Sequence, residues 1–97
     1  MGKIALVTGA TSGIGASFAH FLAAKGYDLV LVARDEKRLS NCAAQLLEKY
    51  GSTSEIISAD LSTTEGMRLV ENRIKKNLDP IEVLINNAGF GIKESFL

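Results

Sequence analysis

Three glycines lie close together near the start of the sequence, within the segment LVTGATSGIGASFA at residues 6–19. Gly9, Gly13 and Gly15 follow an apolar run and precede an alanine-rich stretch. Glycine permits a tight turn and leaves room where a ligand or a helix approaches the backbone. A helix that begins there presents unpaired amide donors and the positive end of its dipole, which suit a pyrophosphate. The glycines therefore indicate a candidate phosphate site, although such a turn can also serve only to pack a helix on a strand.

Hydroxyl side chains accompany the glycines. Thr8, Thr11 and Ser12 could each add a donor to a bound phosphate. The spacing G-x-x-x-G-x-G differs from the dinucleotide fingerprint G-x-G-x-x-G, because three residues separate the first two glycines. No Gly-Lys-Ser/Thr follows to supply the phosphate lysine and the magnesium hydroxyl, which argues against a P-loop phosphohydrolase.

The second apolar run ends in Ala33, and the next residue is Arg34. In dinucleotide sites an acidic residue about 20 positions beyond the glycine turn binds the ribose 2′-hydroxyl, whereas an arginine accepts a 2′-phosphate. The first acidic residue here is Asp35, which we expect to cap the following helix. Arg34 therefore favours NADP over NAD, with Lys37 or Arg38 as candidate helpers. The alternative is that Arg34 is a solvated loop charge.

These residues need elements to position them. Short apolar runs at residues 3–7, 29–33, 55–58 and 83–85 alternate with three segments of helical spacing. Nearly continuous Val, Ile, Leu and Ala is typical of parallel strands that are covered on both faces. The pattern predicts an α/β fold with a Rossmann-like, doubly wound parallel sheet. Right-handed crossovers predict the strand order 3-2-1-4, the first half of such a sheet, with the glycine turn at the switch point where ligands bind.

The three helices have recognisable ends and apolar faces. The first is expected to begin near residues 12–13 and to stop at Gly26. The second should be capped by Asp35 and stop at Gly51, and residues 62–65 match a capping box before the third. The positions expected to face the core are Ile14, Phe18 and Leu22 in the first helix, Leu39, Cys42 or Ala43, Leu46 and Tyr50 in the second, and Met67, Val70 and Ile74 in the third.

Composition limits the classes of function. The 97 residues include 11 Lys plus Arg and 11 Asp plus Glu, so the formal net charge is zero, which argues against nucleic acid or an anionic membrane as a partner. A single cysteine, Cys42, excludes an internal disulfide and a multi-cysteine metal site. No apolar run approaches the roughly 20 residues of a membrane span, and the N-terminus does not resemble a signal peptide. We expect a cytoplasmic protein with one nucleotide-binding half-domain over residues 1–97.

Two motifs together resemble the short-chain dehydrogenase/reductase family. They are TGATSGIG at residues 8–15 and NNAG at residues 86–89, and Asp60-Leu61 adds a third match. The resemblance covers essentially the whole chain, as the N-terminal, cofactor-binding part of such an enzyme. It implies hydride transfer between a nicotinamide and a carbonyl or alcohol, with NADP(H) preferred over NAD because an arginine follows the second strand.

The resemblance also implies roles for single residues. Gly9, Gly13, Ile14 and Gly15 would surround the pyrophosphate, Asp60 would contact the adenine edge, and Leu61 would pack on that ring. Asn87, Ala88 and Gly89 would line the adenosine ribose and the nicotinamide side. Many NADP-preferring members carry a basic residue just before the second glycine, but this chain has Ser12 there, so the 2′-phosphate would depend on Arg34.

Structural alternatives exist for two of these motifs. Asp60 could be only a turn residue near a helix start. Asn86 and Asn87 could tie the end of the fourth strand to its neighbours, and for Asn86 we favour that role.

The family's catalytic serine, tyrosine and lysine have no match in this chain. A tyrosine acid/base with a reference pKa of about 10 needs a lysine four residues later to lower it. Tyr27 is followed four positions on by Leu31, and Tyr50 by Ser54. We therefore expect an inactive N-terminal fragment of a reductase, with no catalytic residues. The alternative is a non-catalytic dinucleotide-binding or self-associating module. In either case we expect a homo-oligomer formed through the fourth strand or the third helix.

Overall fold

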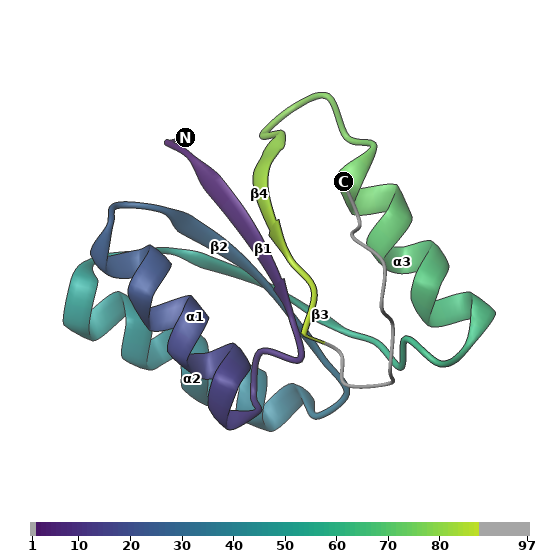
Figure 1. The fold of residues 1–97 in the computed structure, drawn as a ribbon, viewed down its shortest axis with the longest axis horizontal. Coiled ribbons are helices and arrows are strands. Elements are labelled where there is room, and N and C mark those ends of the chain that lie inside the picture. Colours follow the sequence, from purple (N-terminus) through teal and green to yellow (C-terminus); the bar gives the residue numbers. More distant parts are fainter. Residues whose placement is uncertain (1, 88–97) are drawn as a thin grey trace.

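The computed structural model describes residues 2–87, which form a four-stranded parallel sheet between helices (Figure 1). The strand order is β3-β2-β1-β4, as predicted, so β1 lies at the switch point of the sheet. In chain order the elements are β1 (Ile4–Thr8), α1 (Gly13–Ala24), β2 (Asp28–Ala33), α2 (Glu36–Tyr50), β3 (Ser54–Ser58), α3 (Thr64–Ile74) and β4 (Ile81–Ile85).

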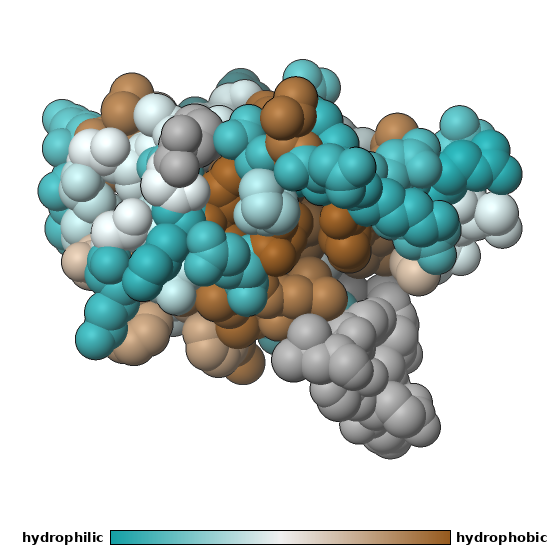
Figure 2. All heavy atoms as spheres, turned by 90° about the horizontal axis from the view of Figure 1, so that it is seen from above, coloured by the Kyte–Doolittle hydropathy of each residue, from teal (hydrophilic) through white to brown (hydrophobic). Residues whose placement is uncertain are grey.

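The sheet is covered on both faces, and its strands are apolar on both sides for that reason. Helices α1 and α2 lie over one face, and α3 lies over the other (Figure 1). Along β1, Ala5 and Val7 face the α1 and α2 side, while Ile4 and Leu6 face the α3 side. Seen from above, hydrophobic atoms gather in the middle of the molecule between hydrophilic flanks, and some of them reach the surface there (Figure 2).

Helix α2 follows the sequence pattern closely. The Asp35 carboxylate accepts a hydrogen bond from the Arg38 amide at 3.1 Å, and Gly51 ends the helix with a φ of 72°. Leu39, Cys42 and Leu46 are buried against the sheet, as predicted. Arg34, the residue expected to bind the cofactor phosphate, therefore lies just before the helix. The neighbouring Asp35 carboxylate is already used as the helix cap.

The predicted buried face of α1 was largely wrong. Leu22 is buried, but Ile14 is 65% exposed and Phe18 is 40% exposed. The helix instead buries a stripe that begins with Gly15 and Ala19. The reason is the close approach of this helix to the glycine turn, because only small side chains fit where its first turn meets the backbone of Gly9.

The start and buried face of α3 also differ from the prediction. Thr63, not Ser62, caps the helix and accepts a hydrogen bond from the Gly66 amide at 3.0 Å. Gly66 lies against the backbone of Asp60, and this contact rotates the helix so that Val70 and Arg73 face the sheet. Met67 and Ile74, which were expected to be buried, are 37% and 41% exposed. Arg73 is accommodated because its Nε donates to both carboxylate oxygens of Glu55 on β3 at 3.1 Å.

No helix within residues 2–87 is both long enough and apolar enough to cross a membrane.

Candidate functional site

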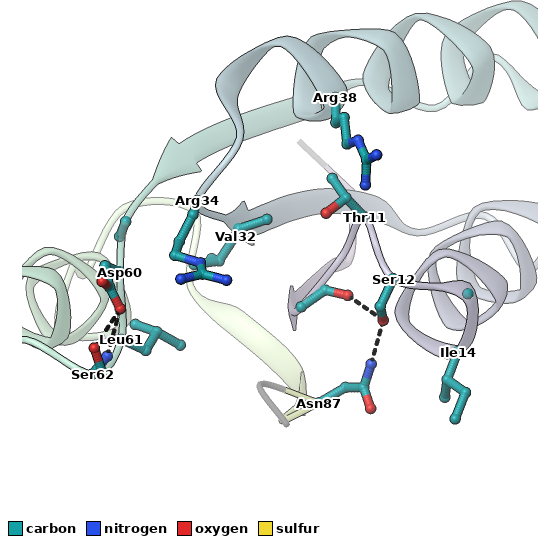
Figure 3. A pocket seen from close by; sticks show the side chains of 14 residues that line it. Thr11, Ser12, Ile14, Val32, Arg34, Arg38, Asp60, Leu61, Ser62 and Asn87 are labelled. Atoms are coloured by element: carbon teal, nitrogen blue, oxygen red, sulfur yellow. Dashed lines mark hydrogen bonds between the residues drawn. The ribbon is translucent and has the colours of Figure 1, made fainter. Parts of the chain in front are cut away.

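A cleft of about 790 Å³ opens at the carboxyl ends of the strands. Its walls come from the turn after β1, the end of β2, the beginning of α2, and the segments after β3 and β4 (Figure 3). Ligands bind at this edge in doubly wound sheets, because the helix N-termini and the flexible loops meet there. The residues that line the cleft are Gly9, Thr11, Ser12, Gly13, Ile14, Val32, Ala33, Arg34, Arg38, Ala59, Asp60, Leu61, Ser62 and Asn87.

The three glycines of the turn have different surroundings. Gly9 has a φ of 62°, and a Cβ there would overlap the carbonyl oxygen of Asn87. A Cβ at Gly15 would overlap the carbonyl oxygen of Gly9. A Cβ at Gly13 would meet no atom within 4 Å, and this glycine lines the cleft. Gly9 and Gly15 are therefore required by packing, whereas the space above Gly13 is open to a ligand.

The first turn of α1 offers backbone donors to that space. The Gly15 amide is satisfied by the Ser12 hydroxyl at 3.1 Å, and the Ala16 amide by the Ser12 carbonyl at 2.8 Å. The amides of Gly13 and Ile14 have no acceptor within the described part of the chain. Two unpaired amides at a helix N-terminus, next to a glycine without a side chain, form a fitting cradle for an anion.

The hydroxyl of Ser12 is fully used by the protein. It donates to the Gly9 carbonyl at 2.8 Å and accepts from the Gly15 amide and from Asn87 Nδ2 at 2.9 Å. A hydroxyl has one donor and two acceptor positions, so none remains for a phosphate. Ser12 instead ties the glycine turn to the residue that follows β4, and the expectation that this hydroxyl donates to the ligand does not fit the geometry.

Thr8 has a similar structural role. Its buried hydroxyl donates to Asn86 Oδ1 at 2.9 Å and accepts from the Asn87 amide at 2.8 Å. The structural role favoured for Asn86 is therefore confirmed. Of the three hydroxyls considered from the sequence, that of Thr11 lines the cleft and has no hydrogen-bond partner among residues 2–87.

Arg34 and Asp60 lie on neighbouring strand ends. Arg34 is exposed and extends into the cleft, and Asp60 lies on its far side from Ser12 (Figure 3). The pKa of Asp60 is held below its usual value, chiefly by a hydrogen bond from the Ser62 hydroxyl at 2.7 Å, then by the Ser62 amide at 3.0 Å, and also by the charge of Arg34. Asp60 is therefore a carboxylate at neutral pH, with one oxygen already occupied by the turn.

Most of the residues that the sequence assigned to a cofactor site line this cleft. Gly15 does not line the cleft, because it lies beneath it against Gly9. Ala88 and Gly89 fall outside the described residues. The sequence reasoning missed Val32 near the end of β2, Ala59 directly after β3, and Ser62 in the turn before α3. For Val32 and Ala59, the position at the end of an apolar run was the signal that could have found them.

Neither tyrosine lines this cleft. Tyr50 lies at the end of α2, where its hydroxyl is 3.1 Å from His20 Nδ1, and Tyr27 precedes β2 at the opposite edge of the sheet. Within residues 2–87 no three His, Cys, Asp or Glu side chains are grouped so that they could hold a metal ion. What the cleft does offer is a set of donors for an anionic ligand, namely the free amides of the first turn of α1 and the side chains of Arg34 and Arg38.

Comparisons with known proteins agree with this geometry. Residues 3–97 match the short chain dehydrogenase family, and the chain therefore belongs to this family. The structure resembles that of the bulky-bulky ketone specific alcohol dehydrogenase from Comamonas testosteroni, with 42% identity and a TM-score of 0.85. It equally resembles a short-chain dehydrogenase from Sphingobium yanoikuyae in complex with NADPH, with 44% identity and a TM-score of 0.85. In each case 97% of this chain is covered.

A curated relative is the very-long-chain 3-oxoacyl-CoA reductase of Phaeosphaeria nodorum, which is 41% identical over 90 residues, or 91% of this chain. The match covers 26% of that reductase, and 37% and 36% of the two solved structures. The chain thus spans between about a quarter and two fifths of the length of these three proteins.

Proposed function

We propose that this chain is the cofactor-binding part of an NADP(H)-dependent oxidoreductase that transfers hydride between a nicotinamide and a carbonyl or alcohol. The observation that carries the proposal is that an exposed arginine at the end of β2 lines the same cleft as an open glycine turn. Family membership supports the oxidoreductase class. One solved relative was crystallised with NADPH, which supports the choice of cofactor.

The residues present fit the pyrophosphate of a dinucleotide. Gly13 leaves the approach open, and the amides of Gly13 and Ile14, two residues that line the cleft, have no acceptor among residues 2–87. Thr11 can add a hydroxyl from the adjacent turn. Gly9, Ser12 and Gly15 would act indirectly, because they hold the turn and the helix in place through packing and hydrogen bonds.

Arg34 would bind the 2′-phosphate of NADP(H). Asp35 does not compete for the ribose, because its carboxylate caps α2. A site built to bind the 2′-hydroxyl of NAD uses an acidic side chain at this position instead. NAD is therefore the less favoured cofactor.

The adenine would lie between Asp60 and Leu61 on the β3 side of the cleft. The oxygen of Asp60 that Ser62 does not use could accept a hydrogen bond from the adenine amino group, and half-buried Leu61 offers an apolar surface to the ring. Asn87, with Ala88 and Gly89 after it, would border the ribose and the nicotinamide side. When bound, the dinucleotide supplies the hydride chemistry, while this chain binds it and orients it.

Catalysis requires a proton donor that this chain does not offer. Neither tyrosine has the lysine four residues later that lowers a phenol pKa, and neither lies at the cleft. We propose that the 97-residue chain alone binds cofactor without turnover.

Replacement of Arg34 tests the choice of cofactor. In a calorimetric titration, Arg34→Ala is expected to weaken NADPH binding about tenfold or more, because a charge-assisted hydrogen bond to phosphate is lost. NADH binding should change less than about twofold, because the dinucleotide without the phosphate makes no such contact. Arg68→Ala, which removes an exposed arginine on α3 away from the cleft, is the matched control. Equal affinity of the unaltered chain for NADPH and NADH would contradict the proposal.

We further propose that the chain self-associates through β4 or α3. Strand β4 pairs with β1 on one side and with no other strand of the described sheet. Helix α3 exposes Met67, Leu69 and Ile74. A free strand edge beside exposed apolar side chains favours pairing, and a net charge of zero does not oppose it.

A further inference from the structure

We infer that Arg38 is a second cation for the 2′-phosphate of NADP(H), acting together with Arg34 as a determinant of cofactor specificity. The inference rests on the proposed function, because it assigns a further residue to the same site. Two basic residues of α2 were open candidates from the sequence, Lys37 and Arg38. The structure separates them, since Arg38 lines the cleft and Lys37 does not.

The position of Arg38 is set by the cap of its helix. The Asp35 carboxylate accepts from the Arg38 amide at 3.1 Å through Oδ1, and its Oδ2 lies 3.8 Å from Arg38 Nε. The Arg38 side chain lies on the side of α2 that faces the glycine turn, because it lines the cleft together with Thr11 and Ser12. Figure 3 shows the guanidinium extending from α2 toward Thr11. Arg38 and Arg34 therefore approach the same cleft from two different elements.

Most of the donors of Arg38 are available. The pair with Asp35 is exposed, with the two side chains 71% and 55% accessible, so it adds little stability and little restraint. The Nη atoms of Arg38 donate no hydrogen bond to any of residues 2–87. A guanidinium whose Nη groups are open can bind two phosphate oxygens at once.

The local charges explain why one arginine is insufficient. The charged residues that line the cleft are Arg34, Arg38 and Asp60, so without Arg38 the charge of Arg34 would only offset that of Asp60. A phosphate monoester has a charge of about −1.5 to −2 near neutral pH. A preference of the cleft for the 2′-phosphate over the 2′-hydroxyl therefore depends on direct contacts to the phosphate. Two guanidinium groups match its charge better than one.

The test uses two small probes that differ only in the phosphate. Adenosine 2′,5′-bisphosphate and adenosine 5′-monophosphate are titrated calorimetrically into the unaltered chain, Arg34→Ala, Arg38→Ala and Lys37→Ala. Arg38→Ala is expected to weaken binding of the bisphosphate about tenfold and to change binding of the monophosphate by less than about twofold. Lys37→Ala removes the same charge one residue away and is expected to change either affinity by less than about twofold. Arg38→Lys should recover part of the loss, because it restores the charge without the planar fork.

The outcomes distinguish this inference from the function on which it rests. If Arg38→Ala prefers the bisphosphate over the monophosphate as strongly as the unaltered chain and Lys37→Ala do, Arg38 has no role in binding the 2′-phosphate. The proposed function would still stand. If the unaltered chain shows no preference for the bisphosphate, both the proposed function and the role of Arg38 are overturned. Unchanged thermal unfolding of each variant confirms that a loss of binding is local, as expected for exposed side chains.

Discussion

The glycine turn separates a packing requirement from a binding requirement, and two single substitutions test that separation. Gly15→Ala would place a methyl group on the Gly9 carbonyl oxygen, which cannot move without displacing the turn. Overpacking of this kind costs about 1–3 kcal/mol, and we expect the upper end of that range because the obstacle is backbone. Gly13→Ala meets no atom within 4 Å, so the fold should tolerate it.

Gly13→Ala should even stabilise the chain slightly. Alanine is favoured over glycine in a helix by about 1 kcal/mol, and the gain at the first helical residue should be smaller. The same methyl group would occupy the approach to the free amides, so NADPH affinity should fall at least about tenfold, or about 1.4 kcal/mol. Gly13→Ala is therefore expected to lose binding without losing stability.

Urea unfolding measures the first effect, and calorimetric titration with NADPH measures the second. Gly2→Ala is a suitable control, because its Cβ would also meet no atom within 4 Å and the residue lies outside the cleft. The reasoning is refuted if Gly13→Ala binds NADPH as tightly as the unaltered chain. It is equally refuted if Gly13→Ala destabilises the fold as much as Gly15→Ala does.

Three further predictions concern the supporting contacts. Ser12→Ala should lower the free energy of unfolding by about 1–2 kcal/mol, because it removes a helix cap together with the bond to Asn87; urea unfolding would show a smaller effect if Ser12 were only an exposed turn residue. Ser62→Ala should raise the pKa of Asp60 toward its ordinary value, which an NMR titration of the carboxyl carbon can follow. Because the pKa of Asp60 is lowered in the folded chain, its contribution to stability is present above the unfolded pKa of about 3.9 and is lost as the pH falls through the folded value. An unchanged pKa of Asp60 in Ser62→Ala would contradict the role given to the Ser62 hydroxyl. Sedimentation at micromolar concentration should show a species heavier than one chain, and a clean monomer would rule out association through β4 or α3.

Much of the fold could be read from the sequence, because its signals are local. Asp35 begins α2 as its N-cap, and Gly51 ends the helix because it adopts a left-handed conformation. The continuous apolar runs identify the buried parallel strands. The buried faces of α1 and α3 could not be read in this way. They are set by the contacts of Gly15 with Gly9 and of Gly66 with Asp60, which join segments that fold together only in three dimensions.

The site was predictable to a similar extent. Residue types and strand ends identify the glycine turn and Arg34 as neighbours, because parallel strands end at one edge of the sheet. Periodicity does not show which donors are already used. The hydroxyl of Ser12 could be recognised as structural only when Asn87 was seen beside it, from a segment far away in the sequence.

The same link between distant segments has a consequence for the order of folding. Strand β1 pairs with β2 across one helix, but between β2 and β4 the chain first adds one further strand and two further helices. The bond from Thr8 to Asn86 closes a loop of 78 positions. By the logarithmic dependence of loop closure on length, this step costs roughly 1 kcal/mol more than joining β1 to β2. We therefore expect β4 to join the sheet last, so that the binding cleft is completed only at the end of folding. A bound dinucleotide would then stabilise the docking of this last strand.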